Sequence, residues 1–162
     1  MLFFICPTDF LESIIDSTSG QEKYYFSSLG NSVAFDANAI EEIKKIITEK
    51  GIREISFVLA NDNCIVSDAL GNQEFSEIIG LHRFYHALNK NKKRTDVSWR
   101  RSNRKHLLLS YHLNNKIKDL KHGLTDLSMD QITISGKIYH REQNSFVDIY
   151  SELICFDYVS LN

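Results

Sequence analysis

The chain has 162 residues, of which 43% are hydrophobic and 25% are charged, and its formal net charge is −2. These values exclude a disordered chain and predict no general attraction to nucleic acid or to an anionic membrane. No apolar run reaches the roughly 20 residues that cross a bilayer. Three widely spaced cysteines do not make a disulfide framework, so we expect a single domain over residues 1–162 in the reducing cytoplasm.

Two short segments near the N-terminus have the composition of strands. Residues 2–6 are a continuous apolar run that Pro7 stops, which is typical of a buried strand. Residues 24–29 are rich in aromatic side chains and end at Gly30 and Asn31, a turn signal.

A helix and a further strand follow at the spacing of a crossover unit. Asp36 or Asn38 can cap the helix, and Gly51 suits its C-terminal end. Its apolar residues recur on one face: Ile40, Ile43, Ile46 and Ile47. Residues 55–60 are nearly all apolar, as in a strand covered on both faces. The strands on either side of this helix should therefore run parallel.

The second half of the chain predicts two more helices and a hairpin. One face of the first helix carries Phe75, Ile78, Ile79, His82 and His86. One face of the second, which ends near Gly123, carries Leu109, Leu113, Ile117 and Leu120. Residues 131–139 and 146–150 alternate around a polar turn, which indicates a hairpin on a sheet edge.

Polar and thiol side chains follow two of these strands. Cys6 ends the first strand, and the run from Asn61 to Cys64 follows the strand at 55–60. Ligands of open parallel sheets bind beyond the carboxyl ends of the strands. If these two strands are neighbours, Cys6 and Cys64 lie in one crevice.

Three segments keep the order and spacing of motifs of one enzyme family. The β-class carbonic anhydrases have a Cys-x-Asp-x-Arg motif, to which residues 6–10 correspond, and an Arg-Asn-Ala-Gly-Asn stretch, to which residues 27–31 correspond. Their His-x-x-Cys motif corresponds to residues 61–64. Residues 132–139 resemble their Ile-x-Gly-x-x-Tyr strand. The chain thus resembles a diverged member of that family. The resemblance implies a three-layer α/β domain with a mainly parallel sheet, helices on both faces and a C-terminal edge hairpin. It also implies a homodimer or higher homo-oligomer.

The departures from these motifs concern the zinc site. The resemblance implies that Cys6 and Cys64 are retained thiolate ligands, but Asn61 stands at the position of the ligating histidine. Thr8 and Phe10 stand at the positions of the aspartate and arginine that orient the bound water. Asp9 lies one place late, and no arginine accompanies it in the motif. An amide oxygen is a poor substitute for imidazole at zinc, so we expect no resident cofactor and no catalytic residue.

Three functions follow from this pattern. The first is a non-catalytic relative with a binding or regulatory role. The second is an active zinc-dependent carbonate dehydratase or other lyase with a rebuilt centre, in which Cys6 and Cys64 bind zinc together with Asn61, Asp62 or a histidine from elsewhere. The third is an anion- or nucleic-acid-binding module that works through the basic segment, residues 90–105.

The basic segment holds eight Lys and Arg residues and one acidic residue, Asp96. Arg100, Arg101 and Arg104 are its candidates for binding a small anion or, less favoured, nucleic acid. A solvated face is the alternative, which we favour. His82 and His86 have the i, i+4 spacing of a metal-chelating pair, but their place on an apolar stripe favours histidines at the edge of the core or at an interface.

Overall fold

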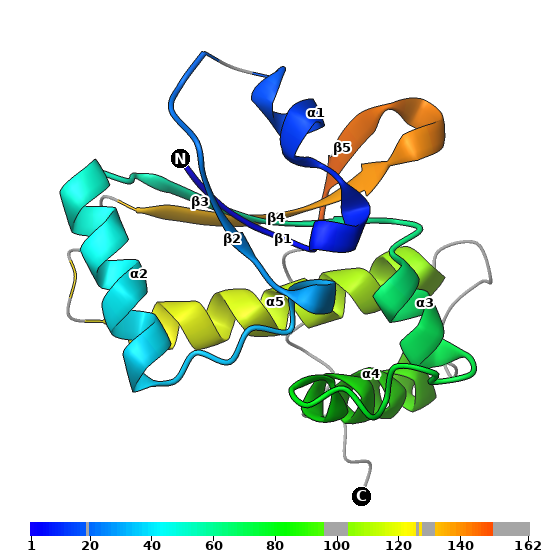
Figure 1. The fold of residues 1–162 in the computed structure, drawn as a ribbon. Helices are drawn as coiled ribbons and strands as arrows, with labels where there is room; N and C mark the ends of the chain where they lie inside the picture. Colours follow the sequence, from blue (N-terminus) through cyan, green and yellow to red (C-terminus); the bar gives the residue numbers. More distant parts are fainter. Residues whose placement is uncertain (19, 96–103, 126, 128–131, 151–162) are drawn as a thin grey trace, which may run out of the picture.

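A five-stranded sheet forms the middle layer of the structure, a computed structural model that describes residues 1–18, 20–95, 104–125, 127 and 132–150 (Figure 1). In space the strands follow the order β2-β1-β3-β4-β5. Their bounds are β1 (Leu2–Ile5), β2 (Tyr24–Ser27), β3 (Glu54–Ala60), β4 (Thr133–His140) and β5 (Ser145–Asp148).

The sheet is parallel except at one edge. β1 pairs with β2 and β3, and β3 pairs with β4, all in parallel, whereas β4 and β5 form an antiparallel hairpin. The predicted parallel crossover is confirmed. It joins β2 to β3, and β1 lies between these two strands in the sheet. The neighbourhood of β1 and β3, on which the predicted crevice depends, is also confirmed, as is the edge position of the hairpin.

The central strand β1 serves two cores because successive side chains point to opposite faces of the sheet. Leu2 and Phe4 belong to the larger hydrophobic core, and Phe3 and Ile5 belong to a smaller one on the other face. In the larger core, the ring of Phe4 stacks on that of Phe57 with centroids 4.5 Å apart. All four β1 residues are buried, as the continuous apolar run predicted.

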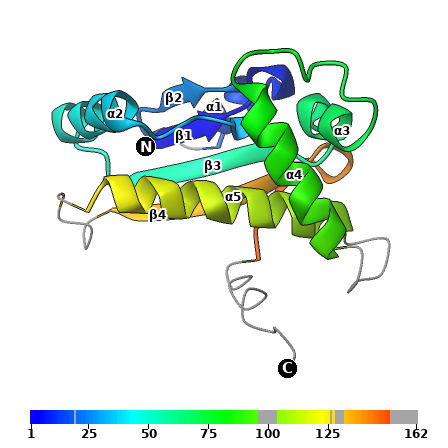
Figure 2. The ribbon, with the colours of Figure 1, turned by 90° about the horizontal axis from the view of Figure 1, so that it is seen from below.

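Helices cover both faces of the sheet unequally. The larger core lies under α2 (Ala37–Lys50), α4 (Leu81–Thr95) and α5 (Arg104–Gly123), which Figure 2 shows from below. Within the part of the chain that the structure describes, the only α-helix on the other face is the short α1 (Glu12–Asp16). Another short helix, α3 (Cys64–Leu70), follows β3 at the end of the sheet. The three-layer α/β architecture is therefore as predicted.

The ends of α2 also follow the sequence signals. The carboxylate of Asp36, rather than Asn38, caps the helix and accepts a hydrogen bond of 2.9 Å from the backbone N–H of Ala39. Gly51 ends the helix in the left-handed conformation, with φ at 59°. In α5, the predicted apolar face is buried: Leu109, Leu113, Ile117 and Leu120.

The prediction that one helix face carries the apolar residues of 75–86 is wrong. Gly80 has φ at 99° and precedes the helix, so α4 begins only at Leu81. Phe75, Ile78 and Ile79 lie before it and are exposed, Ile79 completely. His82 and His86 are exposed on α4, not at the edge of the core. The buried face of α4 is instead formed by Leu81, Phe84, Tyr85 and Leu88.

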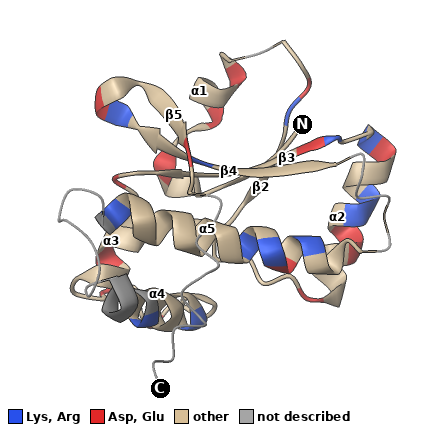
Figure 3. Ribbon diagram, turned by 180° about the vertical axis from the view of Figure 1, so that it is seen from behind, with Lys and Arg blue, Asp and Glu red and all other residues tan. Residues whose placement is uncertain are grey.

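Charged side chains lie mainly on the helices and around the hairpin, and the strands are largely uncharged (Figure 3). Within the described part of the chain, no helix is long and apolar enough to span a membrane. Of the predicted anion-binding residues, Arg100 and Arg101 lie outside the described residues. The backbone of Arg104 begins α5.

Candidate functional site

Cys6 lies at the carboxyl end of β1, as predicted, and its side chain is completely buried. The backbone N–H of Gly30 donates a hydrogen bond of 3.1 Å to its sulfur. The hydroxyl of Thr8 lies 3.1 Å from the same sulfur. The thiol is therefore enclosed by the turn that follows β2 and by η1 (Pro7–Asp9), the single 3-10 turn that follows β1.

Cys64 is the first residue of α3 and is exposed. The helix is capped by Asn63, whose side-chain oxygen accepts a hydrogen bond of 2.8 Å from the N–H of Val66. Because β1 and β3 are neighbours, both cysteines follow strand ends at the same edge of the sheet. Both are free thiols, and they differ sharply in their access to solvent.

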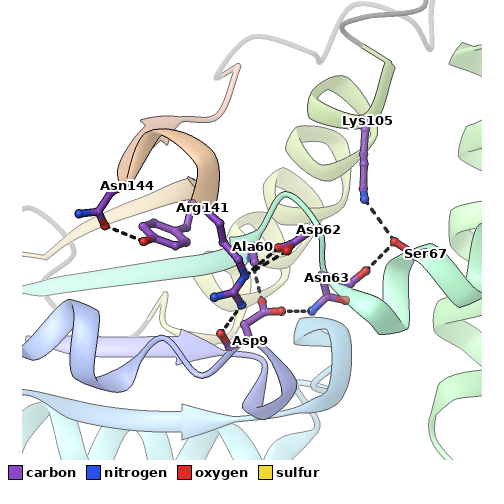
Figure 4. A network of polar contacts seen from close by, with 9 residues as sticks. Asp9, Ala60, Asp62, Asn63, Ser67, Lys105, Arg141 and Asn144 are labelled. Carbon is purple, nitrogen blue, oxygen red and sulfur yellow. Dashed lines mark hydrogen bonds and ion pairs between the residues drawn. The ribbon is translucent and has the colours of Figure 1, made fainter.

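Asp9 connects η1 to the loop between β3 and α3. One carboxylate oxygen accepts a hydrogen bond of 2.8 Å from the N–H of Ala60, and the other accepts one of 2.7 Å from the side-chain amide of Asn63 (Figure 4). The side chain is 1% exposed. Burial raises the pKa of Asp9 to about 6, although both hydrogen bonds and the charge of Arg141 oppose the rise.

Arg141, in the turn η5 (Arg141–Gln143) of the hairpin, reaches the same loop from the opposite side. Its Nε lies 3.1 Å from each carboxylate oxygen of Asp62, and its Nη2 donates to the backbone carbonyl of Asp9 (Figure 4). No arginine was expected beside Asp9, because this partner lies 132 positions away along the chain. An arginine does accompany Asp9, but it binds the carbonyl and not the carboxylate.

The turn η2 (Leu29–Asn31) is the third component of this edge. The side-chain amide of Asn31 donates to the carbonyls of Phe4 and Val58, at 3.1 and 2.9 Å, and so joins β1 to β3. Its own side-chain oxygen is buried without a hydrogen-bond partner among the described residues. Gly30 adopts φ of 61°, and a Cβ there would lie 2.7 Å from the ring of Phe84. The predicted turn at Gly30 and Asn31 is thus confirmed and closely packed.

His112 is a buried residue of this edge that the sequence did not single out. Its Nε2 lies 2.9 Å from the carbonyl oxygen of Gly30. Burial and, to a smaller extent, the nearby charge of Lys116 together lower the pKa of His112 to about 4. The ring is therefore neutral at physiological pH, with Nε2 donating to the carbonyl. Its 82-residue separation from Gly30 left no sequence signal.

Comparison with solved structures identifies the architecture. The β-carbonic anhydrase CafD of Aspergillus fumigatus superposes with a TM-score of 0.73 at 17% identity, over 93% of this chain and 89% of that one. One of two tetrameric β-carbonic anhydrases of Sordaria macrospora gives 0.69 at 13% identity, over 91% and 79%. A Coccomyxa β-carbonic anhydrase in complex with acetazolamide gives 0.68 at 8% identity, over 91% and 70%. This chain has the β-carbonic anhydrase fold. No family model matches the sequence, and no curated protein matches it.

The β-carbonic anhydrase resemblance implies a bound zinc ion, but the residues at this edge do not provide the full set of ligands for it. Two thiols are present, but the third position is Asn61, whose side chain offers only an amide. Asp62 is held by Arg141. Among the described residues, no three His, Cys, Asp or Glu side chains are arranged to hold a metal ion. The donor set therefore does not fit the three-ligand centre that the resemblance implies.

The residues at the remaining motif positions are exposed or contact other parts of the protein. Phe10, at the arginine position, is 75% exposed and has φ of 54°. Thr8 contacts the Cys6 sulfur. The N–H of Asn61 donates to the Tyr139 carbonyl at 2.8 Å, and its side chain lines a separate cavity described below.

Proposed function

We propose that this chain is a carbonic-anhydrase-like protein that has lost zinc-dependent hydration of carbon dioxide and has a binding or regulatory role. The observation that carries the proposal is the residue at the nitrogen-donor position. Hydration requires a metal that lowers the pKa of its bound water to about 7. Asn61 supplies no imidazole for that metal, and the carboxylates nearest to it already have partners.

The surroundings of the two thiols support the same conclusion. The sulfur of Cys6 is engaged by the Gly30 N–H and the Thr8 hydroxyl. Cys64 is exposed at the start of α3. A buried free cysteine commonly behaves as a small apolar residue, and the contacts of Cys6 agree with that role.

The test is the zinc content of freshly purified protein together with stopped-flow hydration of carbon dioxide. We expect well under one zinc per chain and no rate above the uncatalysed reaction. A matched variant, Asn61→His combined with Thr8→Asp and Phe10→Arg, restores the motif residues and should raise the zinc content. One zinc per wild-type chain with hydration that a chelator abolishes would contradict the proposal. It would establish instead an enzyme with a rebuilt centre on Cys6 and Cys64.

We also propose that the chain forms a homodimer or a higher homo-oligomer. The loop before α4 exposes Phe75, Ile78 and Ile79, by 40%, 42% and 101%, and Phe10 is exposed at the edge of the sheet. Large apolar side chains exposed on one loop favour a protein contact. One of the superposed proteins is described as tetrameric. Sedimentation velocity should give more than one chain per particle, and Ile79→Asp should lower that number. A wild-type monomer at all concentrations would contradict this.

A further inference from the structure

A cavity of about 340 Å³ lies between the β4–β5 hairpin and the first turn of α5. The side chains that matter for its chemistry are Asn61, Lys105, His106, His140, Asp148 and Tyr150. They come from the loop after β3, the start of α5, the last residue of β4, and the segment at and after the end of β5. None of them belongs to the two-thiol arrangement discussed above, apart from Asn61 at its border.

Two imidazoles face one another in this cavity. The rings of His106 and His140 are nearly parallel, at 21°, with centroids 5.9 Å apart. The ring of Tyr150 packs edge-on against His106 at 4.8 Å. Burial and the neighbouring His140 lower the pKa of His106, while a hydrogen bond with the Asp148 backbone raises it. Two protonated rings this close repel one another unless an anion lies between them.

The acidic groups around the cavity already have cationic partners. Asp148 pairs with Lys137 at 2.6 Å, and Asp62, beyond Asn61, pairs with Arg141 at 3.1 Å. Lys105 forms no ion pair among the described residues. Its ammonium donates a hydrogen bond of 3.2 Å to the Ser67 hydroxyl, and the charges of Asp62 and Asp9 act on it from farther away. The cavity is therefore lined by one lysine that forms no ion pair among the described residues and by two histidine rings.

We propose that this cavity binds a small oxyanion, such as sulfate or a phosphate group, between Lys105 and the His106–His140 pair. Lysine and protonated imidazole both donate charge-assisted hydrogen bonds to oxyanions. Asn61 also lines the cavity, and its side-chain amide is a neutral hydrogen-bond donor. The proposal is independent of the lost zinc chemistry, because it uses neither cysteine.

A metal ion is the other ligand that a histidine pair suggests. A stable zinc site needs three or four protein donors. The described residues bring no third His, Cys, Asp or Glu into position beside the pair. Charge and donor geometry therefore favour the anion.

The test is calorimetric titration of the full chain with sodium sulfate at pH 5.5 and pH 8, at constant ionic strength with chloride. Sulfate keeps the same charge over this range, so a pH effect reports on the protein. We expect one sulfate per chain and an affinity at least about tenfold higher at pH 5.5 than at pH 8. The reason is that uptake of one proton on binding changes the binding constant about tenfold per pH unit. His140→Gln and Lys105→Met should each weaken binding at pH 5.5 by about tenfold or more. His82→Gln, an exposed histidine on α4, is the matched control and should bind like the wild type.

Four results would overturn the proposal. The first is no saturable binding at either pH, and the second is equal affinity at both. The third is loss of binding in Arg100→Gln/Arg101→Gln but not in Lys105→Met, which would place the anion at Arg100 and Arg101 and not in the cavity. The fourth is stoichiometric zinc binding that His140→Gln abolishes, with no sulfate binding, which would make the cavity a metal site. Circular dichroism of each variant confirms that the fold is intact.

Discussion

The carboxyl edge of the sheet has an inner half and an outer half that treat their polar groups in different ways. The inner half comprises Cys6, Asp9, Asn31, Asn63 and His112, all buried. The outer half comprises Asn61, Cys64, Lys105, His106 and His140, which are half-buried or exposed. Almost every inner group forms a hydrogen bond with another part of the protein, whereas the outer groups are at least partly open to solvent. The inner half therefore stabilises the fold, and the outer half is the more accessible to a ligand.

The largest difference expected between the halves is in thiol reactivity. The third cysteine of the sequence, Cys155, is first replaced by serine so that two thiols remain. Iodoacetamide should then modify the exposed Cys64 readily. Cys6 should react at least about 1,000-fold more slowly, because it must wait for the structure to open. Mass spectrometry of tryptic peptides over time measures both rates. In denaturant the two should become equal, and similar rates in the native protein would contradict the burial of Cys6.

Asp9→Ala tests the inner half directly. It leaves the N–H of Ala60 and the amide of Asn63 without their acceptor, and each buried unpaired donor costs about 1–3 kcal/mol. We expect the free energy of unfolding to fall by about 2–4 kcal/mol in urea titrations. The control is Asp62→Ala, which removes an exposed ion pair with Arg141 and should cost less than about 1 kcal/mol. An equal loss of unfolding free energy in the two variants would contradict the difference between the inner and outer halves.

Two inner groups should give opposite dependences of stability on pH. Asp9 has its pKa raised from 3.8 to about 6, so the folded state binds more protons than the unfolded state between these values. Its contribution to stability is lost as the pH rises through about 6, by roughly 3 kcal/mol. His112 has its pKa lowered from 6.5 to about 4, so its contribution is lost, by a similar amount, as the pH falls through about 4.

These two effects should nearly cancel in the wild type between pH 4 and 6.5. Compared with the wild type, Asp9→Asn should become more stable as the pH rises, and His112→Gln should become less stable. Urea unfolding at several pH values measures both slopes. If the free energy of unfolding depended on pH in the same way in all three proteins, neither Asp9 nor His112 would have the shifted pKa described above.

A smaller effect separates backbone strain from packing. Gly30 and Gly51 have nearly the same positive φ, 61° and 59°, but only at Gly30 would an added Cβ meet another side chain, that of Phe84. Gly51→Ala should cost about 1 kcal/mol, and Gly30→Ala should cost about 1–3 kcal/mol more. Thermal or urea unfolding of both variants gives the difference. Equal costs would mean that the ring of Phe84 moves aside freely.

Much of the architecture was predictable because its signals are local. The strand at residues 2–6, the helix capped by Asp36 and the C-terminal hairpin each combine an apolar period with a terminating residue, and all three are confirmed. α1 and α3 were missed because five and seven residues give too few turns to show a period. The helix expected to include Phe75 was placed too early, because the apolar spacing continued across Gly80 although the backbone does not.

The candidate site was predictable only in outline. The order of Cys6, Asn61 and Cys64 along neighbouring strands placed them at one edge. The partners that decide their chemistry come from far along the chain: Arg141 for the Asp9 loop, His112 for Gly30, and the His106–His140 pair for the cavity. Such contacts leave no trace in spacing, since they depend on how α5 and the hairpin dock against the sheet.

The position of Gly30 has a consequence for the order in which the protein folds. Its N–H meets a sulfur 24 positions earlier, and its carbonyl meets a ring 82 positions later. During synthesis, this turn cannot be completed until α5 has left the ribosome. The N-terminal strands should therefore wait for the second half of the chain, and such long-range closure slows folding.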